Sequence, residues 1–102
     1  MRETPISQRI AKRLSRLPRT VVVKLHGSQY STVAVMPDLM IVRAGKVAFL
    51  ETKSTHGKTR PRQDYMLELL RAAGAVVGVV RSVEEAVTAL TKEGMISRKE
   101  NE

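Results

Sequence analysis

The chain has 102 residues and a formal net charge of +8 at pH 7, from 18 basic and 10 acidic side chains. It contains no cysteine, which excludes disulfides and thiolate metal sites. No apolar run approaches the roughly 20 residues that span a bilayer, and the N-terminus lacks the apolar core of a signal peptide. We therefore expect a single cytoplasmic domain that makes no contact with a membrane.

The charge balance favours a polyanionic partner, usually nucleic acid, over the alternative of a basic protein that binds none. Aromatic residues make up only 3% of the chain, so base stacking is not expected to be the main binding mode. Contact with backbone phosphates fits the composition better.

A first helix is predicted to begin at Thr4 and Pro5, a favoured pairing of N-cap and first helical position. Apolar residues then recur at helical spacing as far as Leu17, and Pro18 disfavours helix in the residue before it. Glu3 is the only acid in this basic stretch. It is interpreted either as a partner of the helix dipole or as part of a metal site.

Residues 20–25 form a β-branched run that predicts the first strand, and residues 26–31 form a polar loop. Long loops in small domains are often functional. His26 lies in this loop, and we interpret it either as a structural residue or as a contact to substrate.

Two short apolar runs, residues 39–43 and 46–50, flank Ala44 and Gly45 and predict a β-hairpin. A two-residue turn would place Asp38 opposite Glu51, with Cβ atoms about 5 Å apart. Side chains alternate along a strand, so Lys53 would share a face with Glu51. Opposed carboxylates repel each other, and a divalent cation with hard oxygen ligands would remove that repulsion.

A polar, basic loop follows Lys53, and a helix is predicted to run from it to about residue 73. Gly74 would end this helix, and its buried face would consist of Met66, Leu67, Leu70 and Ala73. Residues 75–80 are nearly all apolar, as in a strand covered on both faces. Ser82 with Glu85 is a capping box for a last helix that closes at Gly94.

The predicted order is α-β-β-β-α-β-α, an α/β fold with a small central mixed sheet flanked by helices. The last strand arrives through a helical crossover, so we expect it to lie parallel to a neighbour. One domain would span residues 1–94, and residues 95–102 would be a flexible C-terminal tail. Lys24, Lys58, Arg60 and Arg62 flank the expected site and could hold phosphates without reading bases, or could be ordinary exposed charges.

These features together resemble the PD-(D/E)xK nuclease superfamily, and most closely the compact stand-alone form of its VRR-NUC family. The resemblance rests on VVKLHGSQYS, PDLMIV, FLETK, Gln63 and AAGAVVGVVRSVEEA, and covers roughly residues 3 to 92. It implies a restriction-endonuclease-like fold. It also implies that Asp38, Glu51, Glu3 and the backbone carbonyl of Thr52 bind a metal ion, that Lys53 orients or activates water or balances charge on the phosphoryl group, and that Gln63 lies beside the site.

The expected function is therefore that of a Mg²⁺-dependent DNA endonuclease, with Mn²⁺ as a substitute. The resemblance implies a homodimer that cuts branched DNA such as Holliday junctions. Two alternatives remain open. One is a non-catalytic basic module that binds nucleic acid, and the other is a nuclease or nickase of other specificity within a larger complex.

Overall fold

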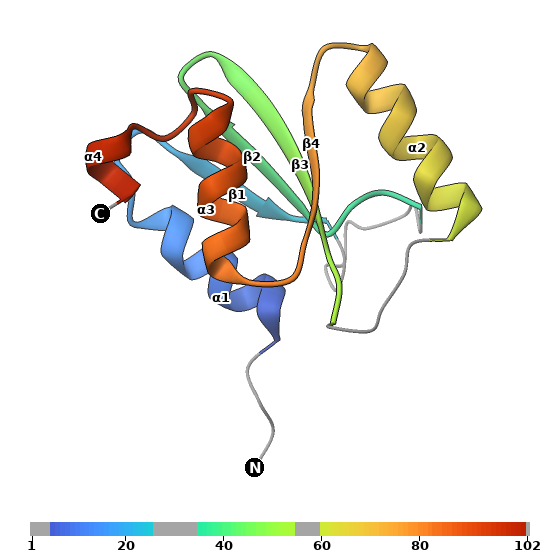
Figure 1. Cartoon of the computed structure of the whole chain (residues 1–102), viewed down its shortest axis with the longest axis horizontal. Coiled ribbons are helices and arrows are strands. Elements are labelled where there is room, and N and C mark those ends of the chain that lie inside the picture. Colours follow the sequence, from blue (N-terminus) through green and yellow to red (C-terminus); the bar gives the residue numbers. More distant parts are fainter. Residues whose placement is uncertain (1–4, 26–34, 55–59, 102) are drawn as a thin grey trace.

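The computed structural model describes residues 5–25, 35–54 and 60–101. Its elements run in the order α1 (Ile6–Ser15), β1 (Val21–Lys24), β2 (Leu39–Arg43), β3 (Lys46–Thr52), α2 (Pro61–Ala72), β4 (Val76–Val80), α3 (Val83–Lys92) and α4 (Arg98–Asn101), as Figure 1 shows. The order matches the predicted α/β fold, with the short α4 added. In the described part of the chain, no helix combines the length and the apolar character needed to cross a membrane.

The four strands form one sheet in the order β1-β2-β3-β4. β2 pairs antiparallel with both β1 and β3, whereas β4 pairs parallel with β3, as expected from its helical crossover. The predicted two-residue turn is confirmed, because Arg43 faces Lys46. Ala44 and Gly45 have φ angles of 55° and 75°, and two positive φ angles match the twist of a tight hairpin.

The sheet is covered unequally on its two faces. Figure 1 shows α1 and α3 on one face and α2 alone on the other. The main core lies between the sheet and the α1–α3 layer, and its most buried residues include Ile10, Leu14, Leu39, Ile41, Leu50 and Leu90. Leu67 is the one buried residue of α2. The α2 face therefore has little apolar packing of its own.

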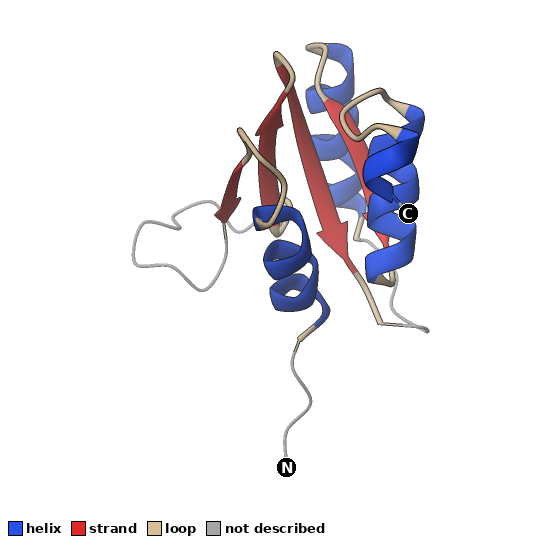
Figure 2. Cartoon of the chain, turned by 90° about the vertical axis from the view of Figure 1, so that its left-hand side faces the viewer, coloured by secondary structure: helices blue, strands red, loops and turns tan. Residues whose placement is uncertain are grey.

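Two predictions about burial are wrong for this reason. Of the four residues predicted for the inner face of α2, Met66 and Leu70 are only partly buried and Ala73 is exposed. β4 is covered less fully than predicted: α3 and α2 contact it from its two faces (Figures 1 and 2), but Val79 is 40% exposed. The pattern of apolar residues along the chain did not show that α2 alone would cover this face of the sheet.

The predicted helix ends are largely confirmed. The Oγ atom of Ser82 accepts a 3.0 Å hydrogen bond from the Glu85 N–H, so Ser82 caps α3. The Glu85 carboxylate turns back one residue further than predicted and accepts from the Arg81 N–H. Gly74 and Gly94 end α2 and α3 with positive φ angles. α1 begins at Ile6, one residue later than predicted, with Pro5 as its N-cap.

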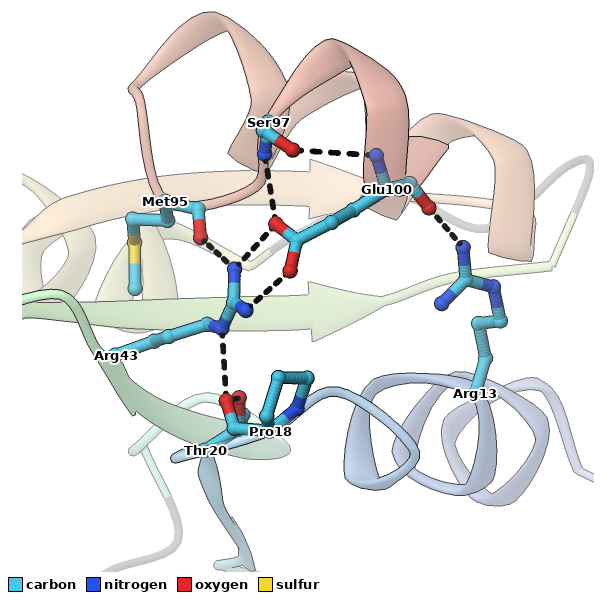
Figure 3. A network of polar contacts seen from close by, with 7 residues as sticks. All are labelled: Arg13, Pro18, Thr20, Arg43, Met95, Ser97 and Glu100. Atoms are coloured by element: carbon cyan, nitrogen blue, oxygen red, sulfur yellow. Dashed lines mark hydrogen bonds and ion pairs between the residues drawn. The ribbon is translucent and has the colours of Figure 1, made fainter. Parts of the chain in front are cut away.

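The segment that was predicted to be a flexible tail is instead packed against the fold. Met95 and Ile96 are 1% and 2% exposed and belong to the main core. Figure 3 shows the Arg43 guanidinium donating to both carboxylate oxygens of Glu100, at 2.8 and 2.6 Å, and to the carbonyl of Met95 at 2.7 Å. Arg43 Nε also donates to the carbonyl of Pro18. The prediction of a tail failed because its apolar residues are too few to form a helical stripe.

Candidate active site

The predicted acidic residues meet at one end of the sheet. Asp38 directly precedes β2, and Glu51 is the second-last residue of β3. Leu39 pairs with Leu50, so the next step outward brings Asp38 beside Glu51. The backbone N–H of Asp38 donates a 3.1 Å hydrogen bond to Oε1 of Glu51. This contact confirms that the two acids are neighbours, as the hairpin register predicted.

Thr52 holds the Asp38 carboxylate in place. Its backbone N–H and its hydroxyl both donate to Oδ2 of Asp38, at 2.9 and 2.6 Å. A carboxylate with two such donors has little freedom to rotate, which preorganises it as a ligand. The expected role of the Thr52 carbonyl as a metal ligand stays a prediction.

Glu51, Lys53 and Gln63 form a closed triangle of polar contacts. Gln63 Nε2 donates to Glu51 Oε2 at 2.8 Å, and Lys53 Nζ lies 3.2 Å from the same oxygen. Lys53 Nζ also lies 3.3 Å from Gln63 Oε1, to which it donates. Strand alternation places Lys53 and Glu51 on one face, toward α2, and α2 supplies the third member. The three predicted residues are therefore brought together.

The start of α2 explains why Gln63 reaches the site. Pro61 opens the helix, where its missing N–H costs nothing. Arg60 is the N-cap and has no side-chain acceptor, so the amide oxygen of Gln63 turns back and accepts from the Arg60 N–H at 3.1 Å. This is one half of a capping box. The other end of the same amide is thereby directed at Glu51.

Glu51 is a buried acid that lies close to a second negative charge, that of Asp38. The residue is only 3% exposed. Burial raises the pKa of its carboxyl above the ordinary value, and the nearby charge of Asp38 raises it further, while Lys53 acts in the opposite direction. A cation bound between the two carboxylates would relieve both effects.

The donor set fits a divalent cation. Asp38 and Glu51 offer carboxylate oxygens, which are hard ligands of the kind that Mg²⁺ prefers. Across residues 5–25, 35–54 and 60–101, no group of three or more histidine, cysteine, aspartate or glutamate side chains gathers around one point. The third acid that was predicted, Glu3, lies outside these residues, as do His26 and Lys58.

Of the predicted phosphate contacts, Arg60 and Arg62 are exposed at the first turn of α2, beside Gln63. Lys24 is exposed at the same end of the sheet, where it pairs with Leu39. Paired residues share a face, so Lys24 leaves the sheet on the side opposite Asp38. The structure thus groups the two arginines with the site and separates Lys24 from it.

Sequence reasoning missed the residue that holds the chain beyond Lys53. Arg81 directly follows β4, and its guanidinium donates to the carbonyl of Ser54. The Lys53 N–H donates to the carbonyl of Val80 at 3.0 Å, so the parallel pairing extends past the end of β3. The signal available in the sequence was the position of Arg81 after a strand predicted to be parallel to a neighbour.

Comparison with known proteins gives one informative result. No family model matches the chain, and no curated protein matches it. A solved structure of a VRR_NUC domain is similar over 84% of this chain and 90% of its own, with 30% sequence identity and a TM-score of 0.63.

Proposed function

Because the chain belongs to the VRR-NUC family, we propose that it is a nuclease, namely a divalent-metal-dependent endonuclease that hydrolyses phosphodiester bonds in DNA. The observation that carries this proposal is the joint placement of Asp38, Glu51, Lys53 and Gln63 at one end of the sheet. Two carboxylates can hold a metal ion, an ammonium can offset charge on the phosphoryl group, and an amide can orient a carboxylate.

Asp38 and Glu51 would hold the metal ion, with Glu3 and the Thr52 carbonyl as further expected ligands. When bound, Mg²⁺ or Mn²⁺ supplies positive charge to the phosphate and lowers the pKa of a coordinated water molecule. Thr52 keeps the Asp38 carboxylate in one orientation, and Gln63 does the same for Glu51.

Lys53 has two roles in this proposal. Its ammonium offsets the negative charge of Glu51 before substrate binds, at 3.2 Å. Its side chain retains 19% exposure, which leaves it open to a phosphate oxygen on which charge develops. One preorganised group of this kind contributes about 3–4 kcal/mol to the stabilisation of a transition state.

Branched DNA, such as a four-way junction, is the proposed substrate, and a homodimer is the proposed active form. Support comes from the one candidate site that the described residues form, since paired cuts in two strands would need two such sites related by symmetry. The net charge of +8 supports binding to DNA phosphates.

The test is cleavage of a four-way junction and of a linear duplex with Mg²⁺, Mn²⁺, Ca²⁺ or EDTA, with the product ends mapped. Paired nicks on the junction that need Mg²⁺ or Mn²⁺ are the expected result. Absence of cleavage of either DNA under every metal condition would contradict the proposal.

A second candidate is a non-catalytic module that binds nucleic acid. It is favoured by the net charge of +8, which supports binding to phosphates whether or not a strand is cut. It predicts binding that weakens steeply with salt and no metal-dependent cleavage. The buried Glu51 argues against it, because binding alone gives no reason to keep an acid with a raised pKa beside Asp38.

A further inference from the structure

An apolar groove lies beside the site, between α2 and the segment that leads into β2. Its volume is about 390 Å³, and it is lined by Val35, Pro61, Arg62, Tyr65, Met66 and Leu69. Tyr65 is 62% exposed and Leu69 is 48% exposed. These side chains recur at helical spacing along one face of α2, and we call this feature the α2 groove.

The α2 groove and the candidate active site both draw residues from the start of α2. Arg62 is adjacent to Gln63 in the chain, so the first turn of α2 contributes to both. On the other wall, Val35 lies three residues before Asp38. A DNA strand that crosses the first turn of α2 would therefore pass both the candidate site and this groove.

The chemistry of the α2 groove fits a nucleobase. Tyr65 offers an exposed aromatic ring, and the neighbouring apolar side chains form a floor for a flat ring system. Arg62 is the charged residue of its lining and would attract a phosphate. The groove volume of about 390 Å³ lies in the range of pockets that bind small ligands.

We propose that the α2 groove binds one unstacked nucleobase of the DNA strand, next to the phosphate held at the active site, with Tyr65 stacking on the base and Arg62 contacting its phosphate. The inference rests on the proposed function and deepens it, because it names the feature of branched DNA that is recognised. Bases at a branch point or bulge are already partly unstacked, so less energy is needed to place one in the groove than in regular duplex. A single stacking contact is compatible with phosphates as the main source of affinity.

The test compares two duplexes that share one backbone. Both carry a single-nucleotide bulge, which holds 2-aminopurine in one and an abasic site in the other. Binding is measured with Ca²⁺ in place of Mg²⁺, so that the strands stay intact. For the unaltered protein we expect about tenfold tighter binding of the 2-aminopurine duplex, within the range measured for one base stacked on an aromatic ring. Fluorescence of the 2-aminopurine should change on binding.

Tyr65→Ala should reduce this tenfold ratio to about one, and Tyr65→Phe should keep it. Tyr65 is well exposed, so neither change should unfold the protein. Val21→Ala is the matched control, because Val21 is 56% exposed on the other edge strand and its replacement should leave the ratio unchanged.

Equal affinity of the unaltered protein for the two duplexes would overturn the inference. So would an equal loss of affinity for both duplexes in Tyr65→Ala. A halved molar mass of Tyr65→Ala in sedimentation, with the ratio unchanged, would instead assign the groove to contact between two copies of the chain. Failure of the proposed function is seen separately, as an intact ratio without metal-dependent cleavage of any DNA.

Discussion

Gln63 on α2 and Glu51 on β3 are joined by a 2.8 Å hydrogen bond from Nε2 to Oε2. α2 has one buried residue, Leu67, so apolar packing alone holds it weakly against the sheet. The contact between Gln63 and Glu51 therefore both orients the acid and positions the helix. A polar side chain at the candidate active site thus contributes to the local fold.

Replacing Gln63 with Ala should lower the rate of metal-dependent cleavage about 10- to 100-fold, the usual effect of losing a group that orients a metal ligand. Single-turnover cleavage of a four-way junction measures this. Glu68→Gln is the matched control, because Glu68 lies on the same helix with its side chain 71% exposed. A rate for Gln63→Ala equal to that of the control would show that Glu51 is oriented without the amide.

Replacing Lys53 with Ala should reduce cleavage by about 10²–10³-fold, because a preorganised cation at the developing charge is lost. Junction binding in Ca²⁺ should change far less, since Lys53 is one of 18 basic residues that could contact phosphates. Cleavage and binding are measured on the same DNA. Unchanged cleavage in Lys53→Ala would remove this residue from the mechanism.

Divalent metal should stabilise the protein in the absence of DNA. A ligand at a hundredfold excess over its Kd adds about 2.7 kcal/mol to the free energy of unfolding, and thermal unfolding with increasing Mg²⁺ or Mn²⁺ measures it. Asp38→Asn should abolish most of this gain. An equal gain in Asp38→Asn and in the unaltered protein would place the metal elsewhere.

The metal effect should weaken as pH falls, because ligation needs an ionised carboxylate. Burial raises the pKa of Glu51, so this loss should begin above the ordinary value near 4.5. Without metal, the contribution of Glu51 to stability depends on pH in the opposite direction. A buried acid with a raised pKa favours the folded state when protonated, so its contribution to stability falls as pH rises through that pKa. Unfolding with and without Mg²⁺ across pH 4–8 tests both directions.

The pair of Arg43 and Glu100 should contribute pH-dependent stability. Its hydrogen bonds lower the pKa of Glu100 to about 2, from an ordinary value of 4.5. A lowered pKa stabilises the folded state above pH 4.5, and this contribution is lost as pH falls toward 2. Glu100→Gln should therefore lower the Tm at pH 7, with a difference that shrinks below pH 4.5. A pH-independent difference would mean that the charge is irrelevant.

Replacing Ala44 with Gly should stabilise the protein by about 1 kcal/mol. Ala44 has a φ of 55°, a conformation that costs an L-residue roughly 1–2 kcal/mol and glycine almost nothing. Some of this gain is offset by the greater freedom of glycine in the unfolded chain. Urea unfolding measures the change, and cleavage should not alter because the turn lies at the far end of the hairpin. A loss of stability would show that the turn tolerates alanine without strain.

Local patterns along the chain predicted the order of the elements up to α3, the hairpin register and the acids at its end. Each depends on residues close in the chain, where strand periodicity, turn residues and helix caps act locally. The pairing of Arg43 with Lys46 and of Ser82 with Glu85 followed from such signals. Gln63 came from a family resemblance, since no local rule aims it at Glu51.

Which elements cover each surface depends on tertiary packing, which local patterns do not contain. Whether Met95 and Ile96 enter the core depends on space left by α1, α3 and the sheet, which spacing along the chain cannot express. The same holds for the exposed face of α2, because burial is set by how many elements reach a surface. Contacts across long separations, such as Arg43 with Glu100 and Arg81 with Ser54, form once the strands and helices are packed. These contacts depend on how the elements pack together, because the residues that form them are far apart in the sequence and no local pattern links them.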